Sequence, residues 1–196
     1  MTRNYFNLPI VFGSVLLATG LFVLITTYLP IFKNEVSYQV LHKKVKTDTT
    51  INPIDSDFGI VIPKIGANSK IIKNVDPFDS TVYQKALTKG VAHANTSKLP
   101  GEGKNIFLFS HSSTDFLTAT RYNSIFYLLS KLEEGDEIKV FYKQKEYQYK
   151  VKDKKVVTPS QINFLKSDSN AETLTLMTCW PPGTDFKRLI VQAVPK

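Results

Sequence analysis

The chain has 196 residues, enough for one domain with attached segments. Hydrophobic residues make up 42% of it, so it can bury an ordinary core and does not have the composition of a disordered protein. The formal charge of +8 comes almost entirely from scattered lysines, and the arginines are Arg3, Arg121 and Arg188. Nucleic-acid binding usually needs arginine forks in a concentrated basic stripe, so this pattern argues against a nucleic-acid partner.

An apolar run without charged side chains extends from Leu8 to Phe32. A membrane-spanning helix needs roughly 20 apolar residues, whereas the apolar core of a cleaved signal peptide has about 7–15. The run ends in Tyr28-Leu29-Pro30-Ile31-Phe32, which is a poor cleavage site. The sequence therefore predicts a short flank at residues 1–7 and a retained single-pass transmembrane anchor at 8–32. The lysines that follow the run would, by the positive-inside rule, place the C-terminal part in the cytoplasm.

Residues 33–57 are polar and lack periodicity, which predicts a tether, and residues 58–196 form the predicted domain. Two segments in the domain have helical character, roughly Ser80 to Thr88 and roughly Ser124 to Lys131. Regular βα alternation is absent, so the pattern predicts a mainly β barrel or sandwich with short helices. The predicted strands lie within Phe58–Ile65, Lys70–Lys73, Ile106–Phe109, Ile138–Tyr142, Tyr147–Lys152, Leu174–Thr178 and Leu189–Val194.

The only cysteine, Cys179, ends a β-type run, and nine positions later Arg188 opens the next one. A nucleophilic cysteine needs a thiolate or an adjacent base, because free thiols with a pKa of about 8.5 are mostly protonated at neutral pH. Three histidines are available as the base. His42 lies in the tether, His93 follows a short apolar stretch, and His111 ends the buried run Ile106–Phe109.

Strand geometry favours His111. A hairpin around Trp180–Lys187 would bring Cys179 and Arg188 to the same end of the sheet, and the long preceding segment allows the strand before His111 to run parallel to the Cys179 strand. The residues alone leave ordinary alternatives open. Cys179 can be a buried apolar thiol, His111 can bond a loop carbonyl, and Arg188 can pair with Asp185.

The run Thr175-Leu176-Met177-Thr178-Cys179, with Arg188 opening the following strand, resembles the signature of the sortases, the cysteine transpeptidases of bacterial cell surfaces. The stretch Leu99–Asn105 before His111 and the stretch Gly90–His93 are similar to further features of that family. The similarity covers roughly Gly59 to Ala193. It implies a closed or nearly closed sortase-like β-barrel for the domain 58–196.

The resemblance also implies a function. Cys179 would attack a Leu-Pro-x-Thr-Gly-like sorting signal of a surface protein, His111 would move the proton, and Arg188 would stabilise the oxyanion, aided by a backbone N–H or by Thr178. The acceptor would be an amine of a peptidoglycan precursor or a pilin lysine, at the cell membrane with the domain extracytoplasmic. No cofactor is needed, and no residue group has metal-ligand spacing.

Two rival functions remain open at this stage. One is a membrane-tethered cysteine peptidase or hydrolase that uses the same three residues with water as acceptor. The other is a non-catalytic β-domain that binds surface ligands.

Three departures from the family pattern concern the neighbourhood of the site. Ser112 follows His111 where many relatives have Arg or Thr, which affects the floor of the pocket. Trp180-Pro181 after the cysteine is similar to the Cys-x-Pro subclasses without deciding between them. Asp76-Pro77-Phe78 resembles the lid motif of pilin-polymerising sortases, but it follows the first strand pair, so we interpret it as a turn before a helix.

Overall fold

The structure is a computed structural model that describes residues 11–26, 51–112, 125–166 and 171–196, and the chain divides into two compact units, Met1–Gln39 and Val40–Lys196. In the first unit, residues 11–26 form an α-helix with exposed apolar side chains. The hydroxyls of Thr19 and Thr26 donate to main-chain carbonyls three and four residues earlier, so both are satisfied inside the helix.

The predicted anchor at 8–32 is only partly described. Its residues 8–10 and 27–32 lie outside the described part of the chain. Within the described part, none of the helices combines the length and the apolar character that crossing a membrane requires.

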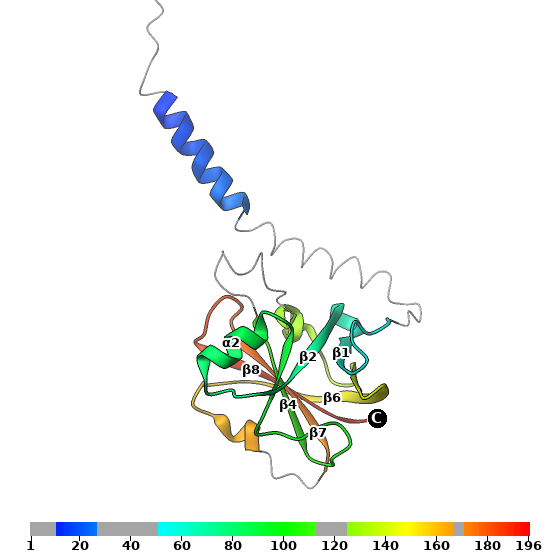
Figure 1. The fold of residues 1–196 in the computed structure, drawn as a ribbon. Coiled ribbons are helices and arrows are strands. Elements are labelled where there is room, and N and C mark those ends of the chain that lie inside the picture. Colours follow the sequence, from blue (N-terminus) through cyan, green and yellow to red (C-terminus); the bar gives the residue numbers. More distant parts are fainter. Residues whose placement is uncertain (1–10, 27–50, 113–124, 167–170) are drawn as a thin grey trace, which may run out of the picture. The chain divides into compact units, whose positions relative to one another are not determined.

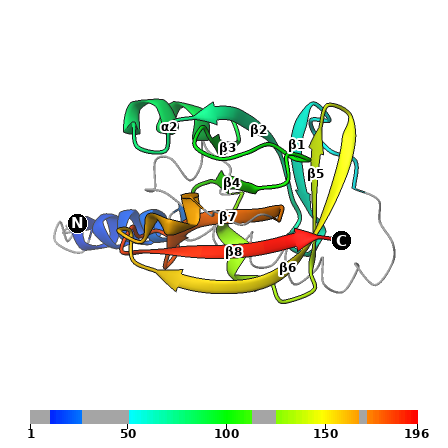
Figure 2. The same cartoon turned by 90° about the horizontal axis from the view of Figure 1, so that it is seen from below.

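The described residues of the second unit form eight strands that close into a barrel in the order β1-β2-β3-β4-β7-β8-β6-β5 (Figures 1 and 2). The strands are β1 (Phe58–Ile62), β2 (Ala67–Val75), β3 (Val91–Ala94), β4 (Asn105–Phe109), β5 (Glu137–Tyr142), β6 (Lys145–Val157), β7 (Thr173–Trp180) and β8 (Lys187–Pro195). The helices in the same described part are α2 (Ser80–Leu87) and the 3-10 helices η1 (Pro63–Ile65), η2 (Tyr127–Lys131) and η3 (Ile162–Lys166). The predicted mainly β, closed barrel with short helices is confirmed.

Two parallel pairs set the topology. β2 and β3 form a parallel pair, and the chain between them contains α2. β4 and β7 form the other parallel pair, and the long segment between them contains η2, β5, β6 and η3. The antiparallel pair of β1 and β5 closes the barrel. Figure 2 shows β4, β7, β8 and β6 side by side, with α2 beside β2 and β3.

The observed ends of several elements differ from the predicted ends, each for a local reason. Pro63 does not continue a strand but starts η1, because it has no N–H for the ladder and its fixed φ suits a first helical turn. The cap of α2 is Asp79 rather than Ser80, since the Asp79 carboxylate accepts from the N–H groups of Thr81 and Val82. The predicted helix near 124–131 is only the 3-10 turn η2, and residue 124 lies outside the described range.

The short strand β3 was not predicted. It has four residues, Val91-Ala92-His93-Ala94, and all of them are buried. Two alanines and a histidine give no alternation, so a strand of this length has no pattern to recognise.

Segment 52–57 of the predicted tether is hydrogen-bonded to the barrel. The Asn68 side chain donates to the Asn52 carbonyl and accepts from the Ile54 N–H. The carbonyls of Ser56 and Asp57 accept from Gln144 and Lys143 at the β5–β6 turn.

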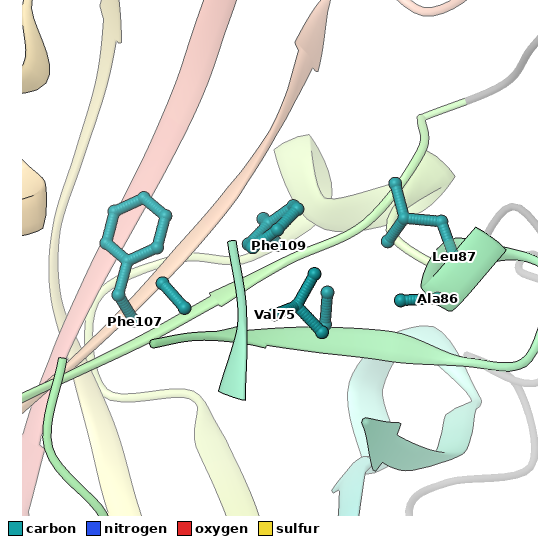
Figure 3. Close-up of a cluster of buried hydrophobic side chains, with 7 residues drawn as sticks. Val75, Ala86, Leu87, Phe107 and Phe109 are labelled. Carbon is teal, nitrogen blue, oxygen red and sulfur yellow. The ribbon is translucent and has the colours of Figure 1, made fainter. Parts of the chain in front are cut away.

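The barrel has an interior core and a second apolar layer outside it. Along β4, Ile106 and Leu108 alternate with Phe107 and Phe109, and all four are buried. Phe107 and Phe109 belong to an outer cluster with side chains of β2, β3 and α2 (Figure 3). The cluster consists of Val75, Ala86, Leu87, Ala92, Ala94, Phe107 and Phe109. β4 is therefore covered on both faces, which explains its uninterrupted apolar sequence.

Candidate active site

The outer faces of β4, β7 and β8 form one continuous surface. Phe107 pairs with Thr175, Phe109 with Met177, and Met177 in turn with Ile190. Paired residues in neighbouring strands lie on the same face of a sheet, and positions two apart share that face. Phe107, Phe109, Met177 and Ile190 line one cavity and form its apolar floor.

All three predicted site residues lie at one end of this floor. Cys179 pairs with Arg188 in the β7–β8 hairpin, two residues beyond the Met177–Ile190 pair. On the other side, the Ser110 N–H donates to the Met177 carbonyl at 3.2 Å, which carries the parallel register one residue beyond β4. Counted on by one more residue, the register of β4 and β7 brings position 111 level with Cys179 along the chain direction. The predicted hairpin and the predicted parallel strand pair are both confirmed.

Thr178 lies on the opposite face of β7 from Cys179. Its side chain is 2% exposed, and its hydroxyl donates to the Ser110 carbonyl at 2.9 Å. The prediction that Thr178 helps to stabilise an oxyanion is therefore wrong, because its only hydroxyl hydrogen is committed to the segment that leads into His111. Thr178 instead fixes the β4 end against β7.

Ser112, the residue after His111, is 1% exposed, and its hydroxyl oxygen has no hydrogen-bond partner among the described residues. The expectation that Ser112 shapes the floor of the pocket has no support here, since Ser112 is not among the side chains that line the cavity.

The guanidinium of Arg188 is held by the main chain of its own loop. Its Nη1 donates to the Asp185 carbonyl at 2.8 Å and to the Lys187 carbonyl at 3.0 Å. The contact with Asp185 is thus through the backbone and not the ion pair that the sequence left open. A guanidinium has five N–H donors, and the groups on Nη2 and Nε are not used by these two bonds.

Burial keeps the resting Cys179 and His111 neutral. Burial raises the pKa of the Cys179 thiol; the positive charge of Arg188 lowers it, and the negative charge of Asp185 raises it further. Burial also lowers the pKa of His111. At neutral pH the pair is therefore a protonated thiol beside an imidazole that can accept a proton.

The cavity along the floor has a volume of about 210 Å³. Its near end reaches Arg188, and its walls come from the β2–α2 connection and from the segment between β6 and β7. Beyond the four floor residues and Arg188, the lining consists of Pro77, Phe78, Tyr83, Val157, Pro159, Gln161, Phe164 and Leu165. The walls are mostly apolar, so the cavity suits apolar groups of a ligand; Arg188 lines it, whereas Cys179 and His111 do not.

A buried amide ties one wall to the floor at the far end from Cys179. Asn105, which is 3% exposed, donates from Nδ2 to the Phe164 carbonyl of η3 at 2.9 Å. Its Oδ1 accepts from the hydroxyls of Thr173 at 3.2 Å and Thr175 at 2.7 Å. One side chain thus joins β4, β7 and η3.

The sequence identified the polar end of this site but not its walls. Asp76-Pro77-Phe78 does form the predicted turn, with the Phe78 N–H bonded to the Asp76 carboxylate at 2.9 Å, yet Pro77 and Phe78 also line the cavity. The sequence also did not predict that Asn105, Tyr83 and Phe164 belong to the site. The signal for Asn105 was present, since an amide at the start of a fully apolar strand needs buried partners.

His93, a histidine in a family-like stretch, is not part of the site. Its Nε2 bonds the Lys98 carbonyl at 2.9 Å, and its Nδ1 accepts from the Asn74 N–H at 3.3 Å. Across the described ranges, no group of three or more His, Cys, Asp or Glu side chains is arranged to hold a metal ion.

Comparison with known proteins agrees with this fold. Residues 60–196 match the family described as the Sortase domain, and the chain therefore belongs to the sortase family. Over 133 residues it is 29% identical to sortase D of Bacillus subtilis (strain 168), a match that covers 66% of this chain and 59% of that protein. The match thus spans about three fifths of the length of that relative.

Solved structures of sortases have the same fold. Sortase C-1 from Actinomyces oris superposes with a TM-score of 0.60 and 30% identity, over 85% of each chain. A lid mutant of sortase A from Corynebacterium diphtheriae superposes with a TM-score of 0.60 and 26% identity, over 72% of this chain and 70% of that one. The similar proteins carry the letters A, C and D, so they do not single out one subclass.

Proposed function

We propose that the protein is a membrane-anchored cysteine transpeptidase that cleaves a Leu-Pro-x-Thr-Gly-like sorting signal and transfers the cleaved surface protein to an amine acceptor. The observation that carries the proposal is the strand register. It brings His111, which is far from the other two in the chain, to the same end of an apolar floor as Cys179 and Arg188. An extended peptide in the cavity has apolar walls for its leucine and proline and the Arg188 side chain at its near end.

The first half of the reaction forms an acyl-enzyme. His111, neutral because of its burial, accepts the thiol proton as Cys179 attacks the carbonyl carbon of the threonine. The unused N–H groups of Arg188 face the negative charge that develops on the carbonyl oxygen. His111 then donates its proton to the departing glycine nitrogen as the C–N bond breaks, which leaves a thioester on Cys179.

The second half reverses these proton movements with a new amine. The acceptor nitrogen attacks the thioester carbon, the C–S bond breaks, and an amide bond forms. His111 takes the proton from the attacking nitrogen and returns it to sulfur. The acceptor is an amine of a peptidoglycan precursor or a pilin lysine.

Membrane attachment through the N-terminal segment is part of the proposal. The run from Leu8 to Phe32 contains no charged residue, and the helix at 11–26 exposes apolar side chains all round. A helix that is apolar on every side is typical of a lipid environment. The proposed orientation places the domain outside the cytoplasm, where surface proteins and the cell wall are found.

The proposal is tested with the full-length protein in detergent micelles, a peptide that contains Leu-Pro-x-Thr-Gly, and an amine donor. Mass spectrometry is expected to show the peptide, truncated after threonine, as a thioester on Cys179 and then as an amide of the donor. Cys179→Ala and His111→Ala are expected to abolish both species. Arg188→Lys is expected to lower the rate sharply, because an ammonium cannot replace a guanidinium fork.

The rival functions give different outcomes in the same experiment. Release of truncated peptide acid, with no amide at any donor concentration, would identify a hydrolase instead. Full binding of the peptide by Cys179→Ala, together with no cleavage by the wild type, would indicate a non-catalytic binding domain. The control is Glu134→Gln, because Glu134 is an exposed carboxylate at the turn before β5.

A further inference from the structure

The loop between β7 and β8 carries one carboxylate, that of Asp185. Trp180 and Lys187 form the last pair of the hairpin, and the loop between them follows directly on the Cys179–Arg188 pair. Two sets of bonds fix its backbone. The Thr184 N–H and hydroxyl both donate to the Pro181 carbonyl, at 3.0 Å and 2.8 Å, and Arg188 holds the Asp185 carbonyl at 2.8 Å.

The side chain of Asp185 contributes nothing visible to the fold. It is exposed, and within the described part of the chain its carboxylate takes part in no hydrogen bond and no ion pair. Arg188, the cation that holds the loop, contacts the backbone of Asp185 and not its carboxylate. A negative charge is thus anchored at this position with its oxygens free for another partner.

The same charge is unfavourable for the first half of the reaction. Asp185 raises the pKa of the Cys179 thiol, against the effect of Arg188, and so makes the thiolate harder to form. Once the thioester has formed, the sulfur carries no charge and this penalty is gone. A carboxylate near the sulfur then favours a positively charged molecule approaching the thioester.

We propose that the Asp185 carboxylate binds the positively charged amine acceptor and holds it beside the Cys179 thioester. This inference rests on the proposed transpeptidase function and identifies the recognition element for its second substrate. It predicts a preference for acceptors that arrive as alkylammonium ions, such as a lysine side chain, whose pKa of about 10.4 keeps it protonated at neutral pH.

The proton balance of this step is simple. The bound ammonium releases one proton to solvent and becomes a neutral amine. Its nitrogen attacks the thioester carbon, a C–N bond forms, and the C–S bond breaks. A second proton passes from nitrogen through His111 to sulfur. Asp185 binds and orients the acceptor and takes no proton.

The test compares two acceptors on the same thioester, formed by the full-length protein in micelles with the sorting-signal peptide. Nα-acetyl-lysine amide is a cation at neutral pH, whereas hydroxylamine is a much weaker base and reacts as a neutral molecule. The measured quantity is the ratio of the two transfer rates. Any effect of a variant on thioester formation cancels in this ratio.

Asp185→Asn is expected to lower the ratio about threefold to fivefold, the range of a solvent-exposed ion pair of up to about 1 kcal/mol. Asp185→Glu keeps the charge and is expected to retain most of the ratio, and Glu134→Gln is expected to leave it unchanged. High salt is expected to lower the wild-type ratio toward that of Asp185→Asn, because it screens exposed charges.

A ratio in Asp185→Asn equal to the wild-type ratio would overturn the inference while leaving the transpeptidase function intact. An equal fall in Asp185→Glu would also overturn it, because the effect would then depend on loop shape and not on charge. Absence of any thioester in the wild type would overturn the proposed function itself, and the inference with it.

Discussion

At the scale of single residues, the surroundings of Cys179 shift the pKa of its thiol in opposite directions. Burial and Asp185 raise its pKa, and Arg188 lowers it. The alkylation rate with iodoacetamide follows the thiolate fraction, so it is expected to rise through a higher pH range than that of free cysteine, which titrates near pH 8.5. Arg188→Gln is expected to slow alkylation several-fold at a fixed pH near 8, because the thiolate loses its stabilising charge. A rate that reaches its plateau below pH 7 would contradict this account.

Two buried hydroxyls lie near His111, and removing one or the other is expected to have opposite effects on stability. Removing the unpartnered Ser112 hydroxyl in Ser112→Ala is expected to leave the free energy of unfolding unchanged or to raise it by up to about 1 kcal/mol, since an unsatisfied buried hydroxyl is unfavourable. Thr178→Val keeps the shape but removes the donor to the Ser110 carbonyl, and is expected to lower the free energy of unfolding by about 1–2 kcal/mol. Urea unfolding of both variants measures the difference, and equal losses would contradict it.

The candidate site was predictable at its polar end because strand endings are visible in sequence. Cys179 and Arg188 end and open apolar runs, and a short hairpin must bring such residues together. The role of Thr178 was mispredicted, because closeness in sequence to Cys179 does not reveal the alternation that turns its side chain into the barrel. The loop carbonyls that hold Arg188 have no sequence signal, since every residue has a carbonyl.

At the scale of elements, strands were predicted best where one face is exposed. Tyr147, Tyr149 and Val151 alternate with polar residues, and the observed β6 runs beyond them in both directions. The outer apolar layer was not predicted. A run such as Ile106–Phe109 shows that both faces are covered, but it does not show that α2 covers the outer one.

The amide of Asn105 joins three elements, so its loss is expected to affect both stability and peptide binding. Asn105→Ala leaves the Phe164 carbonyl and two threonine hydroxyls without this partner, and is expected to lower the free energy of unfolding by about 2–4 kcal/mol. Because η3 forms a wall of the cavity, KM for the sorting-signal peptide is expected to rise more than kcat falls.

Asn68→Ala is the matched control for this prediction. The Asn68 amide also makes hydrogen bonds to main-chain groups, but they join β2 to Asn52 and Ile54, and none of these residues lines the cavity. Asn68→Ala is expected to lower the free energy of unfolding without changing KM for the peptide. A rise in KM of the same size in both variants would show that general loosening, and not the position of η3, controls peptide binding.

At the scale of the whole molecule, closure of the barrel depends on contacts between segments that sequence patterns do not connect. The pairing of β1 with β5 links residues 78 to 84 positions apart, and the parallel pairing of β4 with β7 links residues 68 positions apart. Local periodicity predicts the strands but carries no information on their order. The family resemblance therefore provided the barrel, whereas the residues alone left a barrel and a sandwich equally open.

His93 couples the stability of this barrel to pH. It is 1% exposed and joins β3 to the ends of two other segments, through the Asn74 N–H and the Lys98 carbonyl. A carbonyl can only accept, so Nε2 carries the hydrogen and Nδ1 is the unprotonated acceptor. Burial lowers the pKa of His93, and Lys73 lowers it further, while the Lys98 carbonyl and Glu102 act in the opposite direction. Protonation of Nδ1 would break its bond with Asn74.

The sign of the resulting pH dependence follows from linkage. Because the folded pKa lies below the unfolded value of about 6.5, the unfolded chain binds more protons between the two values. The contribution of His93 to the free energy of unfolding is therefore fully present above about pH 6.5, and it decreases as the pH falls toward the folded pKa. One such group changes the free energy of unfolding by at most about 1.4 kcal/mol per pH unit. The melting temperature is expected to fall accordingly as the pH drops below about 6.5.

Substitution separates His93 from His111, whose pKa burial also lowers. His93→Gln cannot titrate, and it is expected to melt at a lower temperature than the wild type above pH 7 but to depend less on pH below that value. His111→Gln is expected to remove a second, separate part of the pH dependence, since the imidazoles belong to different hydrogen-bond environments. If the melting temperature of His93→Gln fell with pH as steeply as that of the wild type, the buried imidazole would not be the group that senses pH, and carboxylates would have to account for the whole effect.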